Sequence, residues 1–246
     1  MTILQIQNLS KSFETSQILR DINLQINKNE IFGIIGINGA GKTTLIKSIM
    51  NLATHPTGRI LLSDVDTKFT VARQSIFYLP EKFLPPKNFT CIEFVQSYLK
   101  LYNITANSDN IYDWASRLDL NHKYLNLKIS KLSKGTVQKI GLLTAFLSNR
   151  QLLILDEPMD GLDVKARVLL KNSIIDYKTS GKSVIFSSHI LTDMEEICDR
   201  IGILDTGSFK FVGTINEFKN QFLQGDKISL EKAFLSLINP CDTHFS

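Results

Sequence analysis

The sequence predicts a mixed α/β fold that combines a buried parallel sheet with an antiparallel β part and a helical part. An apolar run, Ile31–Ile35, leads into a glycine-rich loop and then into apolar residues at helical spacing. Segments that alternate apolar and polar residues precede this run, and a long stretch with helical periodicity separates it from later strands. This order of patterns indicates an α/β core with a subdomain inserted into it.

Antiparallel strands are expected near the start of the chain. Residues 3–9 and 22–26 alternate apolar and polar side chains, as half-buried strands do. The run at 31–35 is mostly apolar, which is typical of a strand that is buried on both faces. Further short strands are expected at 60–62 and 76–79.

The stretch over 89–147 carries helical periodicity and sits between strands, so we interpret it as a helical subdomain. Pro80, Pro85 and Pro86 bound it on the N-terminal side. Prolines at these positions suit a hinge, because each restricts the backbone before it.

Strand patterns return after the helical part. They lie at 152–155, 183–187, 200–204 and 209–212, and the last two are spaced as a hairpin. Residues 228–238 have the pattern of an amphipathic helix. We therefore expect one domain over 1–225 and a C-terminal helix and tail over 226–246.

Composition and charge argue against several classes of protein. The chain has 246 residues, 43% apolar and 21% charged, and its net charge of +4 includes no dense Lys/Arg block, so no nucleic-acid partner is expected. No apolar stretch approaches the ~20 residues that span a bilayer, and the first residues lack a signal-peptide pattern, so we expect a soluble protein that is not exported. Cys91, Cys198 and Cys241 form neither a zinc pattern nor a disulfide framework, as is usual in a reducing compartment.

The segment Gly-Ile-Asn-Gly-Ala-Gly-Lys-Thr-Thr at 36–44 has the pattern of a phosphate-binding loop. Glycines let its backbone N–H groups approach an anion, and the helix that begins near Lys42 adds the positive end of its dipole. Lys42 can reach the β- and γ-phosphates of a nucleotide, and the Thr43 hydroxyl can hold Mg²⁺. The loop residues expected to bind the nucleotide are Gly36, Asn38, Gly39, Ala40, Gly41, Lys42, Thr43 and Thr44.

A second set of polar residues follows strands whose carboxyl ends should meet the same crevice. Asp156 and Glu157 end one apolar strand. Asp156 is expected to face the Mg²⁺ held by Thr43, and Glu157 to polarise the water that attacks the γ-phosphate. His189 ends the next strand, from where it can hydrogen-bond a γ-phosphate oxygen.

Together these motifs resemble the nucleotide-binding subunit of an ATP-binding cassette (ABC) transporter, and the resemblance covers nearly the whole chain. The family's hinge loop corresponds to 78–81, and its signature Leu-Ser-Gly-Gly-Gln to Leu-Ser-Lys-Gly-Thr at 132–136. The loop at 160–163 and His189 follow in the family's order, and Phe13 stands where such proteins stack an aromatic ring on adenine. The resemblance implies a P-loop NTPase core with an antiparallel β subdomain and a helical subdomain.

The resemblance also implies a function. Such a subunit hydrolyses ATP with Mg²⁺, and two chains sandwich the ATP, so Ser133 and Gly135 are expected to serve the phosphate loop of a second ABC subunit, identical or different. Glu157 and His189 are then the catalytic residues. The residues implied for Mg²⁺ are Thr43, Asp156 and Glu81. A separate multi-span membrane permease would carry the substrate, with this chain in the cytoplasm on the inner face of the cell membrane.

Three positions depart from the family pattern. Glu81 stands where glutamine is common, Lys134 replaces the first glycine of the signature, and Thr136 replaces its glutamine. An acid at 81 repels phosphate unless a metal intervenes, whereas Lys134 adds a cation on the phosphate side. Similar substitutions resemble those of subunits that work with export-type permeases, and the tail at 229–235 resembles the terminal helix of exporter-type cassettes. An exporter-like subgroup is therefore expected.

Two other functions stay open at this stage. A soluble ABC ATPase could act on DNA, ribosomes or a protein assembly, but such proteins often carry two cassettes or long coiled-coil insertions, which this chain lacks. A regulatory module could bind ATP with weak turnover. The altered signature favours that second function, whereas Glu157 and His189 oppose it.

Overall fold

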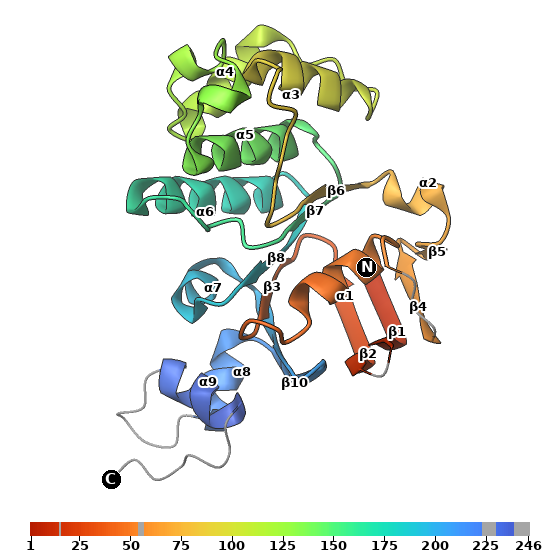
Figure 1. Cartoon of the computed structure of the whole chain (residues 1–246). Coiled ribbons are helices and arrows are strands. Elements are labelled where there is room, and N and C mark those ends of the chain that lie inside the picture. The colour runs from red at the N-terminus through yellow and green to blue at the C-terminus, as the bar shows by residue number, and fades with distance from the viewer. Residues whose placement is uncertain (15, 54–56, 223–229, 239–246) are drawn as a thin grey trace.

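The computed structural model describes residues 1–14, 16–53, 57–222 and 230–238 (Figure 1). These residues form a four-stranded antiparallel sheet, a six-stranded sheet and helices that pack on them. The mixed α/β fold with an antiparallel β part and a helical part is therefore confirmed.

The strands and helices of the described residues have the following bounds. The strands are β1 (Thr2–Phe13), β2 (Ser16–Asn27), β3 (Ile31–Ile35), β4 (Thr57–Leu62), β5 (Val65–Asp66), β6 (Ile76–Leu79), β7 (Leu152–Leu155), β8 (Ser183–Ser188), β9 (Arg200–Asp205) and β10 (Ser208–Gly213). The helices are α1 (Lys42–Ile49), α2 (Thr70–Arg73), α3 (Cys91–Lys100), α4 (Ser108–Arg117), α5 (Lys134–Leu147), α6 (Val164–Thr179), α7 (Leu191–Ile197), α8 (Ile215–Phe222) and α9 (Leu230–Ile238).

The six-stranded sheet has the order β10-β9-β3-β8-β7-β6. Its strands from β9 to β6 are parallel, and β10 pairs with β9 in the expected antiparallel hairpin. The carboxyl ends of β3, β6, β7 and β8 therefore meet at one edge, which is where ligands bind in open α/β sheets.

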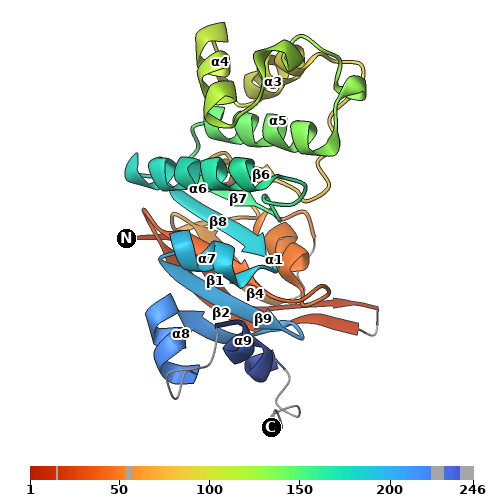
Figure 2. The ribbon, with the colours of Figure 1, turned by 90° about the vertical axis from the view of Figure 1, so that its left-hand side faces the viewer.

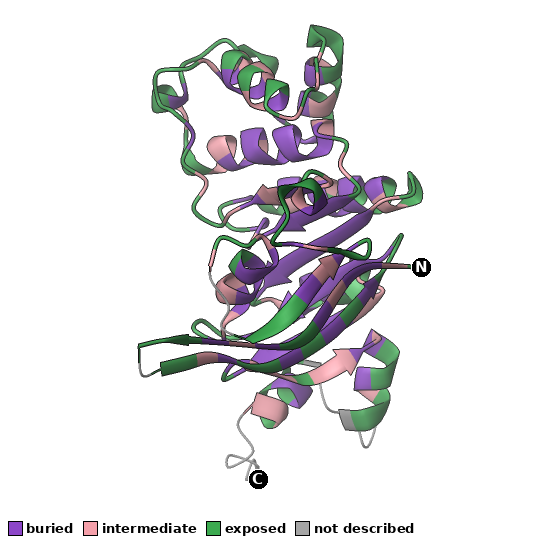
Figure 3. Cartoon of the chain, turned by 90° about the vertical axis from the view of Figure 1, so that its right-hand side faces the viewer, coloured by how far each residue is buried: buried purple, intermediate pink, exposed green. Residues whose placement is uncertain are grey.

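Alternating side chains of the central strands bury two separate cores. Phe32 and Ile34 of β3 pack with α1 and the antiparallel sheet, whereas Ile31 and Ile35 face the helices of the other side. Figure 1 shows α1 between β3 and the antiparallel strands, and Figure 2 shows α6 and α7 on the opposite face. Every residue of β3, β7 and β8 is buried, so these strands run through the purple interior of Figure 3, which explains the apolar runs of β3 and β7 and the apolar centre of β8.

Helices α3, α4 and α5 pack together at the end of the molecule that lies away from the antiparallel sheet (Figures 1 and 2). Trp114 of α4 stacks on Phe146 of α5 with ring centroids 4.7 Å apart, and Phe146 meets Tyr177 of α6 edge to face. A methyl group on Gly141 of α5 would lie 2.7 Å from a side-chain carbon of Leu79, the last residue of β6. The helical part is therefore joined to α6 by aromatic packing and to the central sheet by one close helix–strand approach.

Several boundaries differ from the expectation. β1 and β2 have 12 residues each, because their pairing continues through register shifts where the apolar–polar alternation breaks. The sequence patterns contain no prediction for α2, α6, α7 or α8. The beginning of the expected terminal helix, the boundary between residues 225 and 226, and Cys241 lie outside the described residues. Among the described helices, none is long and apolar enough to cross a bilayer.

A buried ion pair ties α6 to α7. The Lys171 Nζ lies 2.8 Å from Asp193 Oδ1, and the two side chains are 11% and 7% exposed. The exposed carboxylate of Glu196 accepts a second hydrogen bond from the same ammonium group. Because α7 begins just after His189, this pair fixes the helix that follows a predicted catalytic residue.

We expect Asp193→Asn to lower the free energy of unfolding by about 3 kcal/mol, because it leaves the Lys171 ammonium buried without its buried counter-charge. Thermal unfolding should show a melting temperature lower by roughly 10 °C. The matched control is Glu196→Gln, which removes the exposed partner of the same lysine and should cost less than about 1 kcal/mol. Equal losses in the two variants would contradict a stabilising role for the buried pair.

Candidate active site

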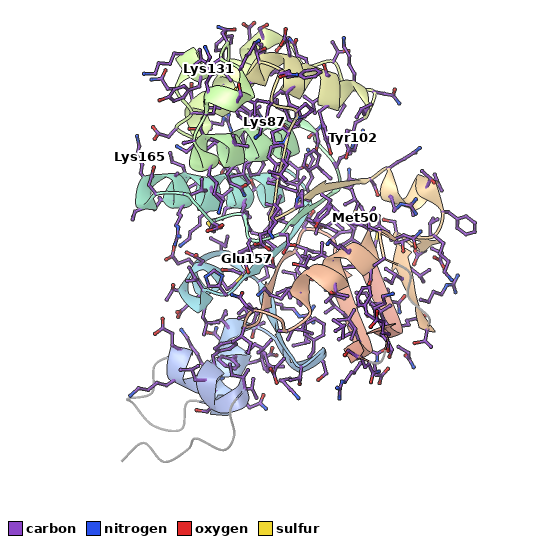
Figure 4. All side chains as sticks on the ribbon, in the orientation of Figure 1. Met50, Lys87, Tyr102, Lys131, Glu157 and Lys165 are labelled. Atoms are coloured by element: carbon purple, nitrogen blue, oxygen red, sulfur yellow. The ribbon has the colours of Figure 1, made fainter. Side chains whose placement is uncertain are left out.

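A cleft of about 620 Å³ opens at the carboxyl edge of the central sheet. The segments that line it follow β3, β6, β7 and β8, and the ends of β1 and β2 add a further wall. Figure 4 labels Glu157 where the central strands end. The expected site residues in the lining are Phe13, Asn38, Gly39, Ala40, Gly41, Lys42, Thr43, Thr44, Glu81, Glu157 and His189.

The phosphate loop turns tightly between β3 and α1. Gly41, the residue before α1, has a φ of 108°, a left-handed value that favours glycine. A side chain on Gly36 would meet the Leu204 carbonyl oxygen at 2.5 Å, so only glycine fits where the loop leaves β3. Gly36 lies behind the cleft lining, where its carbonyl accepts a 2.7 Å hydrogen bond from Lys42 Nζ.

Lys42 is buried at the base of this loop. Besides its hydrogen bond to the Gly36 carbonyl, its Nζ lies 3.3 Å from Glu157 Oε1. The ammonium group is thus held inside the curve of the loop by oxygen atoms. Phosphate oxygens are stronger acceptors of charge-assisted hydrogen bonds than a carbonyl, so a nucleotide can replace these partners.

Asp156 is fully buried just after β7. Because it follows Leu155, the alternation of the strand points its side chain to the face that carries α1. There Oδ2 accepts a hydrogen bond from Thr43 Oγ1 at 2.9 Å, and Oδ1 accepts one from Ser187 Oγ at 2.6 Å. Burial raises the pKa of the Asp156 carboxyl above its ordinary value, while the two hydrogen bonds act against that rise.

Glu157 leaves the strand in another direction, because its φ of 47° is left-handed and uncommon for a residue with a side chain. Its N–H donates to Ser187 Oγ at 2.9 Å. The turn brings Oε1 to 3.3 Å from Lys42 Nζ and Oε2 to 3.0 Å from His189 Nδ1. Since a carboxylate only accepts hydrogen bonds, Nδ1 of His189 carries the proton in this contact and Nε2 is left for another partner.

The outer wall of the cleft carries Phe13, whose ring is at the end of β1 and is 51% exposed. The Lys11 ammonium lies 4.3 Å from the centroid of this ring, a cation–π contact. Glu81, after β6, lines the cleft as expected. Ile18, Ile37 and Asp160 line it as well. Ile37 lies within the phosphate-loop pattern and Asp160 within the loop at 160–163, but neither was among the expected site residues.

Ser133 and Gly135 do not belong to this lining. Ser133 caps α5, with its side chain accepting a hydrogen bond from the Thr136 N–H at 3.2 Å. Gly135 packs on the loop after β7, because a methyl group there would lie 2.6 Å from the Gly161 carbonyl oxygen. The structure therefore does not bring these two residues to the phosphate loop of their own chain.

Comparisons with protein families and with known proteins establish the family of this chain. A family model described as ABC transporter matches residues 19–160. The chain is 35% identical over 222 residues to the uncharacterized ABC transporter ATP-binding protein YhaQ of Bacillus subtilis, with 89% of this chain and 74% of that protein covered. The chain belongs to the ABC transporter family.

Another relative and a solved structure extend the match over nearly the whole cassette. The linearmycin resistance ATP-binding protein LnrL of Bacillus subtilis is 30% identical over 250 residues, covering 96% of this chain and 78% of that protein. A structure of the ATP binding subunit of an ABC transporter superposes with a TM-score of 0.87 at 29% identity, covering 96% of this chain and 99% of that one. The present chain is thus an ABC ATPase domain.

The charge of the cleft fits the Mg²⁺ that accompanies ATP in an ABC ATPase. Its lining carries the acids Glu81, Glu157 and Asp160 beside the cation Lys42. An anionic nucleotide in such surroundings needs a further positive charge to offset the repulsion. The Thr43 hydroxyl and the buried carboxylate of Asp156 are the hard oxygen ligands that Mg²⁺ takes, and Glu81 could hold it through water.

Tyr78, the first residue of the hinge loop at 78–81, was not among the expected site residues but supports the same conclusion. The Tyr78 hydroxyl is buried and forms no hydrogen bond within the described part of the chain. Burial, and then the negative charges of Asp156 and Glu81, raise the pKa of this phenol well above its ordinary value. A buried polar group without a partner is costly, and the charges of Asp156 and Glu81 act on this phenol, so we expect the hydroxyl to gain a hydrogen-bond partner when the hydrated cation is bound.

Ser187, Asp160 and Tyr78 are therefore added to the expected site residues, although Asp160 and Tyr78 lie within the motifs at 160–163 and 78–81. Ser187 faces Asp156 because β7 and β8 are neighbours in register. One signal was available, since the polar run Ser-Ser-His ends β8 just as Asp-Glu ends β7.

We expect Tyr78→Phe to separate the stability of the protein from its affinity for the metal. Without Mg²⁺, removal of the unpartnered hydroxyl should leave the free energy of unfolding unchanged or raise it by about 1 kcal/mol. With Mg²⁺ and ATP, the ligand-induced rise in melting temperature should be smaller than in the parent protein.

The matched control is Tyr177→Phe, because the Tyr177 hydroxyl donates a 2.6 Å hydrogen bond to the Arg150 carbonyl. That variant should lose about 1 kcal/mol whether or not Mg²⁺ is present. If Tyr78→Phe behaves like Tyr177→Phe, the Tyr78 hydroxyl has no role at the metal.

Proposed function

We propose that this chain is the ATP-binding and ATP-hydrolysing subunit of an ABC transporter, that it works as a dimer of cassettes, and that it drives a separate multi-span membrane permease. The observation that carries the proposal is the position of the Glu157 carboxylate, held between Lys42 and His189 at the mouth of the phosphate loop. A carboxylate in that position can accept a proton from water next to a bound γ-phosphate.

Binding of ATP uses groups that are already in place. The backbone N–H groups of the phosphate loop and the start of α1 receive the phosphates, and the exposed ring of Phe13 stacks on adenine. Lys42 turns from the Gly36 carbonyl and Glu157 to the β- and γ-phosphates. Mg²⁺ held by Thr43 and Asp156, with Glu81 close by, would neutralise phosphate charge and polarise the γ-phosphate.

Hydrolysis then relies on the two residues after β7 and β8. Once Lys42 has turned to the phosphates, Glu157 is free to orient a water and to take its proton as the water oxygen bonds to the γ-phosphorus and ADP leaves. His189 holds the Glu157 carboxylate through Nδ1, and its Nε2 can donate to the γ-phosphate when the ring is protonated.

The second half of the site is assigned to another chain. Ser133 and Gly135 lie at the N-terminal end of α5 and do not line their own cleft, and such a helix end suits an anion. Closure of a second cassette, identical or different, would bring its signature onto the γ-phosphate, and ADP release would reopen the pair.

The partner and the direction of transport rest on the relatives. YhaQ and LnrL are named as an ABC transporter ATP-binding protein and a resistance ATP-binding protein. Resistance is a task that outward transport can perform, which supports an export-type permease and a location on the inner face of the membrane. The loop around Glu81 is suited to transmit closure to that permease, because it joins β6 to the helical part.

Glu157→Gln tests the assignment. The amide keeps the shape of the side chain but cannot take a proton, so turnover should fall by about 10²–10⁴-fold while ATP binding persists and a closed dimer accumulates. Phosphate release, equilibrium binding of ATP and the sedimentation of the protein with Mg·ATP measure these three quantities.

The control is Glu231→Gln, which changes an exposed carboxylate on α9 and should leave all three quantities unchanged. Undiminished turnover in Glu157→Gln would refute the catalytic assignment. A parent protein that binds ATP but releases no phosphate would instead favour the regulatory module.

A further inference from the structure

An ion pair joins the signature of this chain to its own nucleotide cleft. Lys134, the first residue of α5, donates a 2.6 Å hydrogen bond from Nζ to Asp160 Oδ2. Asp160 lines the cleft that holds Lys42 and His189, whereas Lys134 lies on the surface proposed to meet the neighbouring cassette. One contact therefore connects two places that would hold two different ATP molecules.

The backbones behind this ion pair are in close contact. A methyl group on Gly135 would lie 2.6 Å from the Gly161 carbonyl oxygen, and one on Gly161 would lie 3.7 Å from the stem of Lys134. The Lys134 side chain thus lies along Gly161 to reach Asp160. The Lys134 side chain is consequently in contact with the loop that follows Glu157.

Without its acidic partners, the charge of the Lys134 ammonium would be electrostatically unfavourable. It stands at the positive end of α5, and no acidic residue occupies the first turn of that helix. The hydrogen bond to Asp160 raises the pKa of Lys134, the negative charge of Glu81 adds to the rise, and the same hydrogen bond lowers the pKa of Asp160. An anion that approaches the start of α5 therefore competes with Asp160 for one ammonium group.

A phosphate is favoured over Asp160 as the partner of the Lys134 ammonium. The side chains of Lys134 and Asp160 are 74% and 47% exposed, and ion pairs in water contribute little to stability. A phosphate enclosed between two cassettes is less exposed, and its oxygens form strong charge-assisted hydrogen bonds. The ammonium group can therefore change partner when the cassettes close.

We infer that Lys134 is a coupling residue that exchanges Asp160 of its own chain for the γ-phosphate of ATP bound to the facing cassette. The inference rests on the proposed dimer. In the open chain Lys134 holds Asp160. On closure the ammonium moves to the phosphate, and the released Asp160 carboxylate stays in the cleft beside His189. The ion pair between Lys134 and Asp160 in each cassette thereby opens in response to ATP bound at the other site.

The test compares two substitutions that should change the affinity of the dimer in opposite directions. In the Glu157→Gln background, with Mg·ATP, the dimer dissociation constant is measured by sedimentation. Lys134→Gln should weaken the dimer roughly tenfold or more, because a charge-assisted hydrogen bond to phosphate is lost. Asp160→Asn should tighten the dimer, because it removes the group that competes for the ammonium. Lys134→Arg should restore dimerisation, and the double variant Lys134→Gln with Asp160→Asn should behave like Lys134→Gln alone.

The matched control is Lys165→Gln. Lys165 forms an ion pair of the same length with Asp119, 2.6 Å, at 70% and 39% exposure, and Figure 4 shows it well away from Glu157. This variant should leave the dissociation constant unchanged. Thermal unfolding of each variant without nucleotide confirms that the fold is intact.

The outcomes separate this inference from the function on which it rests. If Lys134→Gln and Asp160→Asn shift the dimer in the same direction, or neither shifts it, the ion pair is only structural and the inference is wrong while the dimer stands. If the Glu157→Gln chain forms no dimer with Mg·ATP, the proposed dimer and the coupling both fall.

Discussion

The buried carboxylate of Asp156 fixes the geometry on which the rest of the site depends. Hydrogen bonds from Thr43 of α1 and from Ser187 of β8 converge on it, so one side chain joins the helix of the phosphate loop to two neighbouring strands. A buried charge is tolerated only when it is hydrogen-bonded in this way. Because Ser187 also accepts the Glu157 N–H, the same hydroxyl sets the left-handed turn that separates Glu157 from Asp156.

Local patterns made the first half of this arrangement predictable. The phosphate loop can be predicted because its glycines, Lys42 and Thr43 are close together in the chain. Strand β7 can be predicted because every residue of that buried strand is apolar. The N-cap at Ser133 is likewise a property of neighbouring residues. The family resemblance then placed Phe13, Glu81 and His189 in one site, and they do line one cleft.

What the sequence could not predict depends on contacts between distant elements. Ser187 has the pattern of an ordinary strand residue, and Tyr78 is marked only as part of the hinge loop. The register of β6, β7 and β8 brings Ser187 into a hydrogen bond with Asp156 and Tyr78 close enough to feel its charge. Asp160 becomes part of the cleft only through the path of the loop after Glu157. Helix α6 has apolar residues but carries charges along its length, so its pattern is weak, and it is held by packing and by the ion pair between Lys171 and Asp193.

Two departures from the family pattern, Glu81 and Lys134, place opposite charges near the cleft. A cation at Lys134 alone would oppose the positive end of α5, and an acid at Glu81 alone would repel phosphate. In this structure the hydrogen bond and the charge of Asp160 favour the charged form of Lys134, and the charge of Glu81 adds a smaller contribution in the same direction. With glycine at 134 and glutamate at 81, the acids Glu81, Glu157 and Asp160 would face the cleft with Lys42 as their main counter-charge, and the nucleotide would meet a more negative site. The unusual signature is therefore better explained as a redistribution of charge around the cleft than as a loss of function.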